Sequence, residues 1–279
     1  MRGNNARITW HHFVGQVQYH GGRIGCDCAA LLKLPYRAII RGIPIFNPHP
    51  EVQLARLDNG RSCVVVDDAL LDPERLVRFA TAQRGSFRET GFNAYPGTYL
   101  FASPGTSEAL NDFFIQHVRR HFDARRVLNM HCRLSMATLS PRQLLPCQWL
   151  CHRDGLQLDP RQSIQASVLY LFKDTGLGGT GFYQAIHPAR ETDRLFHDAR
   201  ILSSAVFAGK YSIEPGYMLH SNPYFTRVGS VPARWNRMIF YDGAMLHSAD
   251  IIAPEKLSHD PLVGRLTLNG FFTSRRKAA

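Results

Sequence analysis

The feature that most constrains the fold of this 279-residue chain is a series of short strand-like runs after Val127. These runs are rich in β-branched and aromatic residues, and turn-forming segments separate them, a pattern typical of β-structure. The runs are Arg133–Leu139, Ile164–Phe172, Gly181–Gln184, Arg237–Tyr241 and Arg265–Phe272. Many strands that follow a helical region predict a jelly roll or a related barrel.

A strand and a helix are predicted ahead of this region. Cys63–Val66 is a β-branched run, and the sequence Asp72-Pro73-Glu74 follows it. Aspartate is a favoured N-cap, proline suits the first helical position, and glutamate complements the positive end of a helix. We therefore expect a helix from this point that ends at Gly85.

Two further helices are expected. One runs roughly from Thr106 to Phe122, and both N-terminal helices are predicted to pack on the outside of a sheet. The other is Glu191–Phe207, where Leu195, Phe196 and Ala199 share one side. We expect this segment to be an insertion over the mouth of the barrel.

The predicted division is a basic N-terminal extension at 1–44, a barrel domain at 45–274 and a basic tail at 275–279. The extension carries six Lys and Arg against one acid, and the tail adds three positive charges, so only +3 of the total +11 belongs to the domain. Because the excess lies mainly at the ends, charge gives little support for a nucleic-acid partner. The extension is expected to be loosely attached or to precede the true start, and Cys26 and Cys28 lack the spacing of structural zinc ligands.

The remaining composition favours a cytoplasmic protein without a membrane partner. No apolar run approaches the roughly 18–20 residues that span a bilayer, and no signal-peptide pattern stands at the start of the sequence. The six cysteines are expected to be free thiols in that compartment.

The candidate chemistry begins at Cys151-His152-Arg153-Asp154-Gly155. In an extended segment the side chains of His152 and Asp154 point to the same face. A second histidine would complete a 2-His-1-carboxylate triad, which leaves positions open on non-haem iron. His247, which follows a predicted strand, is our candidate. His220 is a rival, but no carboxylate stands two residues from it, and it could line a substrate pocket instead.

Two look-alike motifs are excluded. The letters His-Arg-Asp also open the kinase catalytic loop, but Asp159 stands where that loop has asparagine, and no Asp-Phe-Gly follows. Gly176-Leu177-Gly178-Gly179-Thr180-Gly181 matches the dinucleotide fingerprint, which requires a helix next. Strand-like residues follow instead, so we interpret this segment as a glycine hairpin.

With Arg265, eighteen residues after His247, these pieces resemble the iron(II)/2-oxoglutarate-dependent oxygenases, especially their prolyl-hydroxylase-like branch. The resemblance covers residues 45–274. Phe46-Asn47-Pro48 and Tyr95-Pro96-Gly97 look closer still to an uncharacterised bacterial branch known only as a domain of unknown function. The resemblance implies a mainly β fold with flanking helices, the double-stranded β-helix, which is a jelly-roll variant related to cupins.

The resemblance also implies the metal and the reaction. His152, Asp154 and His247 would hold Fe(II), where O2 and the co-substrate 2-oxoglutarate react to give succinate and CO2. Halogenating relatives lack the carboxylate ligand, so the presence of Asp154 favours hydroxylation.

The remaining site residues that the resemblance implies serve the co-substrate. Arg265 would bind the distal carboxylate of 2-oxoglutarate through a bidentate guanidinium. Thr267, on the same strand face, would donate its hydroxyl to that carboxylate. Tyr170 is a further candidate for contact with the co-substrate, with a place in the core or at the rim as the alternative.

The substrate is not encoded in these residues, because loops around the barrel mouth select it. A small metabolite, an amino acid and a peptide side chain all stay open, as does the oligomeric state. Two other hypotheses are a non-catalytic jelly-roll binding or scaffold protein and an oxygenase that acts on nucleic acid. Intact ligands and Arg265 argue against the first, and the charge distribution makes the second unlikely.

Overall fold

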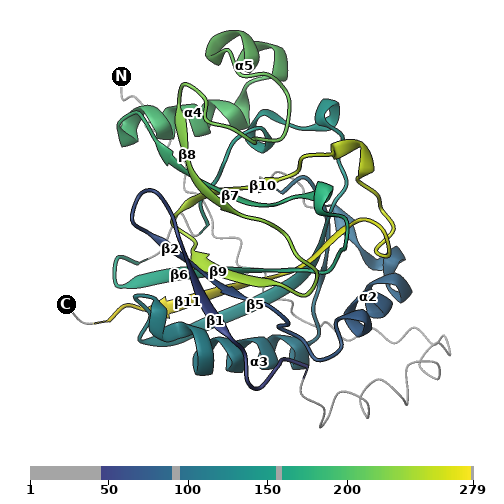
Figure 1. Ribbon diagram of the computed structural model, residues 1–279. Coiled ribbons are helices and arrows are strands. Elements are labelled where there is room, and N and C mark those ends of the chain that lie inside the picture. The colour runs from purple at the N-terminus through teal and green to yellow at the C-terminus, as the bar shows by residue number, and fades with distance from the viewer. Residues whose placement is uncertain (1–44, 90–94, 155–158, 278–279) are drawn as a thin grey trace, which may run out of the picture. The chain divides into compact units, whose positions relative to one another are not determined.

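The computed structural model describes residues 45–89, 95–154 and 159–277 (Figure 1). The chain divides into two compact units, 1–43 and 44–279, of which only the second contains described residues. The predicted basic extension, with Cys26 and Cys28, therefore lies outside them. None of the described helices is long and apolar enough to cross a membrane.

Two antiparallel sheets form the centre of this unit. The larger sheet contains, in spatial order, β1 (Val52–Arg56), β2 (Ser62–Val66), β9 (Met238–Asp242), β6 (Gln162–Tyr170), β11 (Arg265–Arg275), β5 (Arg126–Ala137), β4 (Gly97–Phe101) and β3 (Arg88–Glu89). The smaller sheet contains β10 (Leu246–Asp250), β7 (Gly179–Ala185) and β8 (Phe225–Val231). The segment at His152 pairs with β10 and extends the smaller sheet by one bridge.

The winding of the chain between the sheets defines the fold. From β5 the chain crosses to the His152 segment, returns to β6, crosses to β7 and β8, returns to β9, crosses to β10 and returns to β11. Four strands of the larger sheet, β9, β6, β11 and β5, thus face four strand positions of the smaller one. This alternation is the jelly roll of a double-stranded β-helix, so the predicted fold class is confirmed.

Helices cover the outer faces of both sheets (Figure 1). Those on the larger sheet are α2 (Pro73–Ala82) and α3 (Pro104–Phe113), as predicted. Asp72 caps α2, because its side chain accepts a hydrogen bond from the Arg75 amide at 3.1 Å. One apolar cluster joins α2 and α3 to the sheet, and in it Phe114 stacks on Phe272 of β11 with ring centroids 4.1 Å apart.

The remaining helices, α4 (Ala189–Ile201) and α5 (Ser204–Tyr211), lie beyond the smaller sheet (Figure 1). The predicted single helix Glu191–Phe207 is wrong in this respect, since the helix breaks after Ile201 and Ser203 caps a second one. Similarly, the helix predicted to reach Phe122 is α-helical only to Phe113 and continues as a π turn and a 3-10 turn.

The strand cores were predicted better than their ends. β5, for example, begins at Arg126, well before the predicted Arg133, and ends two residues before the predicted Leu139. Five strands were not predicted, because they are short or have a mixed polar pattern that is also found in turns. They are β1, β3, β4, β8 and β10.

The glycine-rich segment after β6 is not the predicted hairpin. β6 and β7 lie in different sheets, so this segment is a crossover between them. Gly178 has φ +76°, and a Cβ there would stand 1.7 Å from the Asp250 carbonyl oxygen of β10. Glycine is needed because the crossover passes against the backbone of the smaller sheet. A strand follows it, so the dinucleotide motif stays excluded.

We expect Gly178→Ala to destabilise the fold far more than Gly60→Ala. Both glycines have positive φ, at +76° and +78°, but a Cβ at Gly60 meets nothing within 4 Å. Gly60→Ala should therefore lose about 1 kcal/mol from backbone strain alone, and Gly178→Ala about 2 kcal/mol more from the clash. Urea unfolding midpoints measure the difference, and equal losses would contradict the close approach.

Candidate metal centre and its cavity

Backbone pairing brings His152 and His247 together. The His152 amide donates to the His247 carbonyl, and the His247 amide donates to the His152 carbonyl, each at 2.9 Å. Two residues further on, the Asp154 amide donates to the Gly243 carbonyl at 2.8 Å. These bonds fix an extended segment against β10 and the turn before it, so residues far apart in the sequence share one place.

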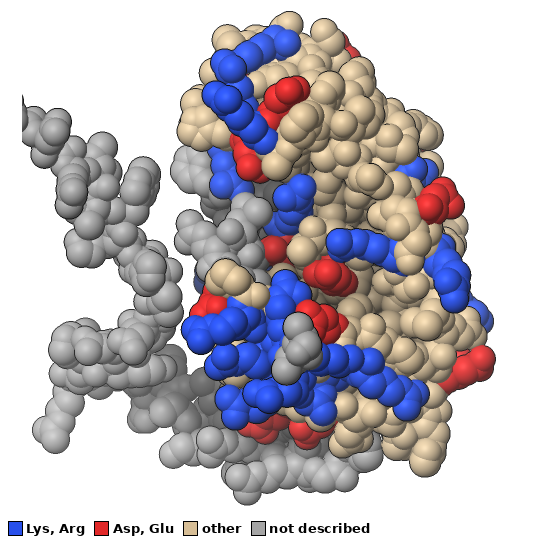
Figure 2. Space-filling model, turned by 90° about the vertical axis from the view of Figure 1, so that its left-hand side faces the viewer, with Lys and Arg blue, Asp and Glu red and all other residues tan. Residues whose placement is uncertain are grey.

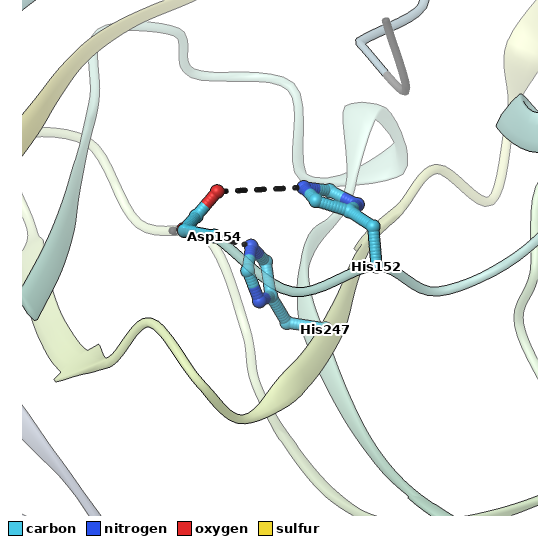
Figure 3. Close-up of side chains that lie close together, drawn as sticks. All are labelled: His152, Asp154 and His247. Carbon is cyan, nitrogen blue, oxygen red and sulfur yellow. Dashed lines mark ion pairs between the residues drawn. The ribbon is translucent and has the colours of Figure 1, made fainter. Parts of the chain in front are cut away.

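The three side chains predicted as ligands point toward one another (Figure 3). Asp154 Oδ2 lies 3.5 Å from His247 Nε2, and Asp154 Oδ1 lies 4.0 Å from His152 Nε2. The two imidazole centroids are 4.3 Å apart. One ligand atom from each residue lies within 4.8 Å of the others, so these three residues form a possible metal site.

Hydrogen bonding supports the fit of a cation at this position. His247 Nδ1 lies 2.9 Å from the Met245 carbonyl oxygen, which can only accept, so Nδ1 donates in this contact. Nε2 faces the carboxylate and is the ring nitrogen that would bind a metal ion. Asp154 Oδ2 is buried and makes no hydrogen bond to any described residue. A metal ion would satisfy both groups, and a carbonyl partner on the outer ring nitrogen is typical of histidine ligands.

The buried environment favours the ligand form of His152 and opposes that of Asp154. Burial, followed by the charges of His247 and Arg133, holds the pKa of His152 well below its ordinary value, so this imidazole is neutral. Burial raises the pKa of Asp154, although His247 and Arg133 oppose the rise. A bound cation would relieve this penalty on the carboxylate. His220, the rival candidate, is not part of the described cluster.

The triad lies in the wall of a cavity of about 440 Å³, a usual size for a small-ligand site. Arg265 and Thr267 line the same cavity, so the structure brings them to the triad as the sequence analysis expected. The Arg265 side chain is almost fully buried at 3% exposure. Its Nε donates to the Leu177 carbonyl at 2.8 Å, and Nη2 donates to the Gly178 and Gly179 carbonyls at 3.3 and 2.9 Å.

This arrangement leaves Arg265 with spare capacity for an anion. The carbonyls belong to the end of the crossover and to the first residue of β7, and they hold the guanidinium plane in place. No described carboxylate pairs with Arg265, and no hydrogen bond from Nη1 was found to a described residue. A buried, oriented guanidinium without an anionic partner is suited to a ligand carboxylate.

Tyr170, unlike Arg265 and Thr267, does not line the cavity. It is fully buried between the sheets, and its hydroxyl lies 2.9 Å from Oγ1 of Thr180, which does line the cavity. The sequence analysis missed Tyr95, which lines the cavity close to Arg265 and Thr267. Burial raises the pKa of Tyr95, so its hydroxyl stays protonated as a donor.

The alternation of β5 and β11 carries a signal that the sequence analysis did not use. Leu134, Met136, Leu266 and Leu268 pack in the cluster with the outer helices, whereas the alternate residues Arg133, Arg265, Thr267 and Asn269 line the cavity. Polar residues at those alternate positions of a buried strand indicate a lined cavity. Arg133 and Asn269 belong to this inner set.

Fold and site together define a jelly-roll protein with a possible two-histidine, one-carboxylate metal site. Residues 48–272 match the profile of DUF6445, a family of unknown function, and the chain belongs to this family. No curated protein matches the sequence.

Several solved structures resemble the fold at low identity. A prolyl-4-hydroxylase from Pseudomonas putida is 12% identical, with a TM-score of 0.41 over 79% of this chain and 95% of that one. HygX from Streptomyces hygroscopicus, solved with nickel and 2-oxoglutarate, is 13% identical, with a TM-score of 0.44 over 78% and 84%. SnoK, a non-heme alpha ketoglutarate dependent carbocyclase from nogalamycin biosynthesis, is 15% identical, with a TM-score of 0.44 over 77% and 80%. Our fold assignment rests on the strand order of this chain.

We expect Asp154→Ala to weaken metal binding by about 100-fold or more, because losing even an outer partner of a ligand costs 10–100-fold. Titration with Co(II) or anaerobic Fe(II) measures the dissociation constant. His220→Ala is the matched control and should bind metal as the wild type does. Equal affinity in Asp154→Ala and wild type would remove the triad as the metal site.

Proposed function

We propose that this protein is an Fe(II)- and 2-oxoglutarate-dependent dioxygenase that hydroxylates a small molecule or a peptide side chain and releases succinate and CO2. One observation carries the proposal. Two histidines and a carboxylate face one another in a cavity that also contains a buried arginine without an anionic partner. A ligand such as 2-oxoglutarate requires both a metal site for its keto acid end and a cation for its distal carboxylate, and this cavity contains both.

Each ligand side chain has a defined task in this proposal. His152, Asp154 and His247 would hold iron(II), which supplies the position where O2 and 2-oxoglutarate react. Since Asp154 occupies one ligand position, hydroxylation is favoured over halogenation.

The co-substrate would be held from the larger sheet. Arg265 would bind the distal carboxylate of 2-oxoglutarate, because the crossover carbonyls fix its guanidinium and leave a nitrogen available. Thr267, fully buried in the same cavity, would turn its hydroxyl from the Ser135 carbonyl, 3.4 Å away, to donate to that carboxylate. We propose that Tyr170 acts on the co-substrate through Thr180, whose hydroxyl it bonds.

The cavity wall also limits water at the reaction centre. Leu150, Phe196, Tyr217 and Phe271 contribute apolar or aromatic surface beside the triad. The Tyr217 hydroxyl donates to the Leu139 carbonyl at 2.6 Å, which fixes its ring. Exclusion of water strengthens the electrostatic contacts to a bound dianion. A cytoplasmic location, where Fe(II) and free thiols persist, remains part of the proposal.

The binding or scaffold alternative requires a site that no longer holds metal. The site geometry does not favour it, since Asp154 Oδ2 is buried without a hydrogen bond to a described residue, and burial of an unsatisfied polar atom is destabilising unless a ligand binds it. Tight capture of a partner by metal-free protein would favour it.

Nucleic acid is considered because of one surface feature. Figure 2, which views the side where the described chain ends, shows Lys and Arg gathered in its lower half. Contacts identify this basic patch as Arg119, Arg120, Arg125, Arg126, Arg161, Arg275, Arg276 and Lys277. Asp123 and Asp159 neutralise part of it by pairing with Arg276 and Arg161. None of its residues lines the cavity, so we propose that the basic patch does not deliver a substrate.

We expect Arg265→Met to raise the dissociation constant of 2-oxoglutarate about 100-fold on metal-loaded protein, because a buried charged hydrogen bond is lost. Calorimetry under anaerobic conditions measures it. Arg200→Met is the matched control, since Arg200 lines the cavity but is exposed. Absence of 2-oxoglutarate binding to wild-type protein that has bound iron would overturn the proposed function.

We expect any oligonucleotide binding to depend on the basic patch and to fall steeply as salt rises. The double variant Arg276→Ala/Lys277→Ala should reduce it while 2-oxoglutarate binding is unchanged. Filter binding at several salt concentrations measures the effect. Oligonucleotide-stimulated succinate release would instead identify nucleic acid as a substrate.

A further inference from the structure

Arg133 presents a second cation to the cavity, apart from Arg265. It lies on β5 directly opposite Asn269 of β11, and directly opposed residues of an antiparallel pair share a face. Arg265 lies four residues away from Asn269 along β11, which is about 13 Å of strand. The inner face of the larger sheet therefore carries two arginines whose backbone positions are well separated along the strands.

Aromatic rings hold Arg133, and it forms no ion pair with a described residue. Its guanidinium carbon lies 5.2 Å from the Phe271 ring centroid, 5.3 Å from that of Tyr99 and 5.9 Å from that of Tyr95. These cation–π contacts orient the group but do not neutralise it. Its Nε is buried without a hydrogen bond, and no described carboxylate forms an ion pair with it. A cation in this state favours an anionic partner.

Asn269 supplies a second unsatisfied group beside it. The Asn269 side chain is buried at 8% exposure and lines the cavity. Its Nδ2 makes one long contact of 3.4 Å to Ser135 Oγ, and its Oδ1 has no partner. If the amide is turned over, the Ser135 hydroxyl donates to Oδ1 and the amide N–H groups become free to donate. Arg133 and Asn269 then form a donor pair that matches a carboxylate.

The charge balance of the cavity supports an anionic substrate. Three arginines that are not exposed line it, Arg133, Arg153 and Arg265, against the single carboxylate of Asp154, whereas the fourth lining arginine, Arg200, is exposed to solvent. A divalent metal and a 2-oxoglutarate dianion cancel each other, so their binding leaves that excess of positive charge in place.

We propose that Arg133, with Asn269, binds the carboxylate of the substrate, so that the enzyme acts on a small organic acid. The inference rests on the proposed function and names its substrate class. A cavity of about 440 Å³ that also binds the co-substrate has room only for a small substrate. Tyr95 and Phe271 provide an aromatic surface for the part of the substrate next to its carboxylate.

Binding of acids and their matched amides tests the proposal. The probes are phenylacetate with phenylacetamide and hexanoate with hexanamide, measured by ligand-observed NMR. Each pair is titrated into metal-free protein and into anaerobic protein with Fe(II) and 2-oxoglutarate. Wild type should bind each acid at least roughly tenfold tighter than its amide, as expected for a charged hydrogen bond.

Variants assign the preference to Arg133. Arg133→Met keeps the apolar stem against the rings and should abolish the preference for acids, whereas Arg133→Lys should retain part of it. Arg200→Met is the control and should keep it. The dissociation constant of 2-oxoglutarate should stay within about twofold of wild type in Arg133→Met, and melting temperatures check that the variants fold.

Three results of these titrations would overturn the inference, and a fourth concerns longer ligands. The three are equal binding of acids and amides by wild type, an unchanged preference in folded Arg133→Met, and loss of 2-oxoglutarate affinity in Arg133→Met like that in Arg265→Met. If the protein bound a carboxylate only when it formed part of a longer peptide, the substrate class would be an acidic peptide, and the inference of a small organic acid would be wrong. Failure of the proposed function is a separate result, since it appears as absent metal or 2-oxoglutarate binding while the metal-free arm still reports on Arg133.

Discussion

The pair of backbone hydrogen bonds between His152 and His247 is the constraint on which the site depends. It attaches an otherwise irregular segment to the edge of the smaller sheet, next to β10. Side chains of paired residues lie within ligand distance of each other, so the register of this single bridge places both imidazoles. Asp154 is also placed by a backbone hydrogen bond, since its amide donates to the Gly243 carbonyl in the turn before β10. A shift of this segment by one residue would send His152 and Asp154 to the opposite face from His247.

The two faces of the larger sheet are built for different tasks. The outer face is apolar and packs on α2 and α3, which gives the hydrophobic contribution to stability. The inner face of β5 and β11 is polar at alternate positions, and burial of those groups is unfavourable unless they find partners. Arg265 finds carbonyls of the crossover after β6, whereas Arg133 and Asn269 remain only partly satisfied. The strain of unmet hydrogen bonds is thus concentrated where a ligand can relieve it.

Local sequence pattern was sufficient for the fold class, for the start of α2 and for the three ligand candidates. His152 and Asp154 share a face by strand geometry alone, and the strand before His247 was recognisable. Arg265 and Thr267 followed from the resemblance, and both reach the cavity. These features depend on neighbours within a few residues or on a motif with fixed order.

Other features depend on which strands meet, and a single sequence does not contain that information. Arg133 becomes a cavity residue only because β5 pairs with β11, more than a hundred residues away. Tyr170 turns to Thr180 of the other sheet. The glycine crossover was taken for a hairpin because its glycines fit both structures. The basic patch joins residues near 120, 161 and 276, so a count along the chain placed the excess charge only at its ends.

Alternation along β5 and β11 separates two kinds of selection. Odd-numbered positions such as Arg133 and Asn269 contact what enters the cavity, and even-numbered positions such as Leu134 and Leu268 contact the helices. Substitutions at the cavity-facing positions can therefore change ligand preference during evolution, while the helix-facing positions preserve the folded state. A library for directed evolution that varies only the odd set would explore new chemistry on an unchanged scaffold.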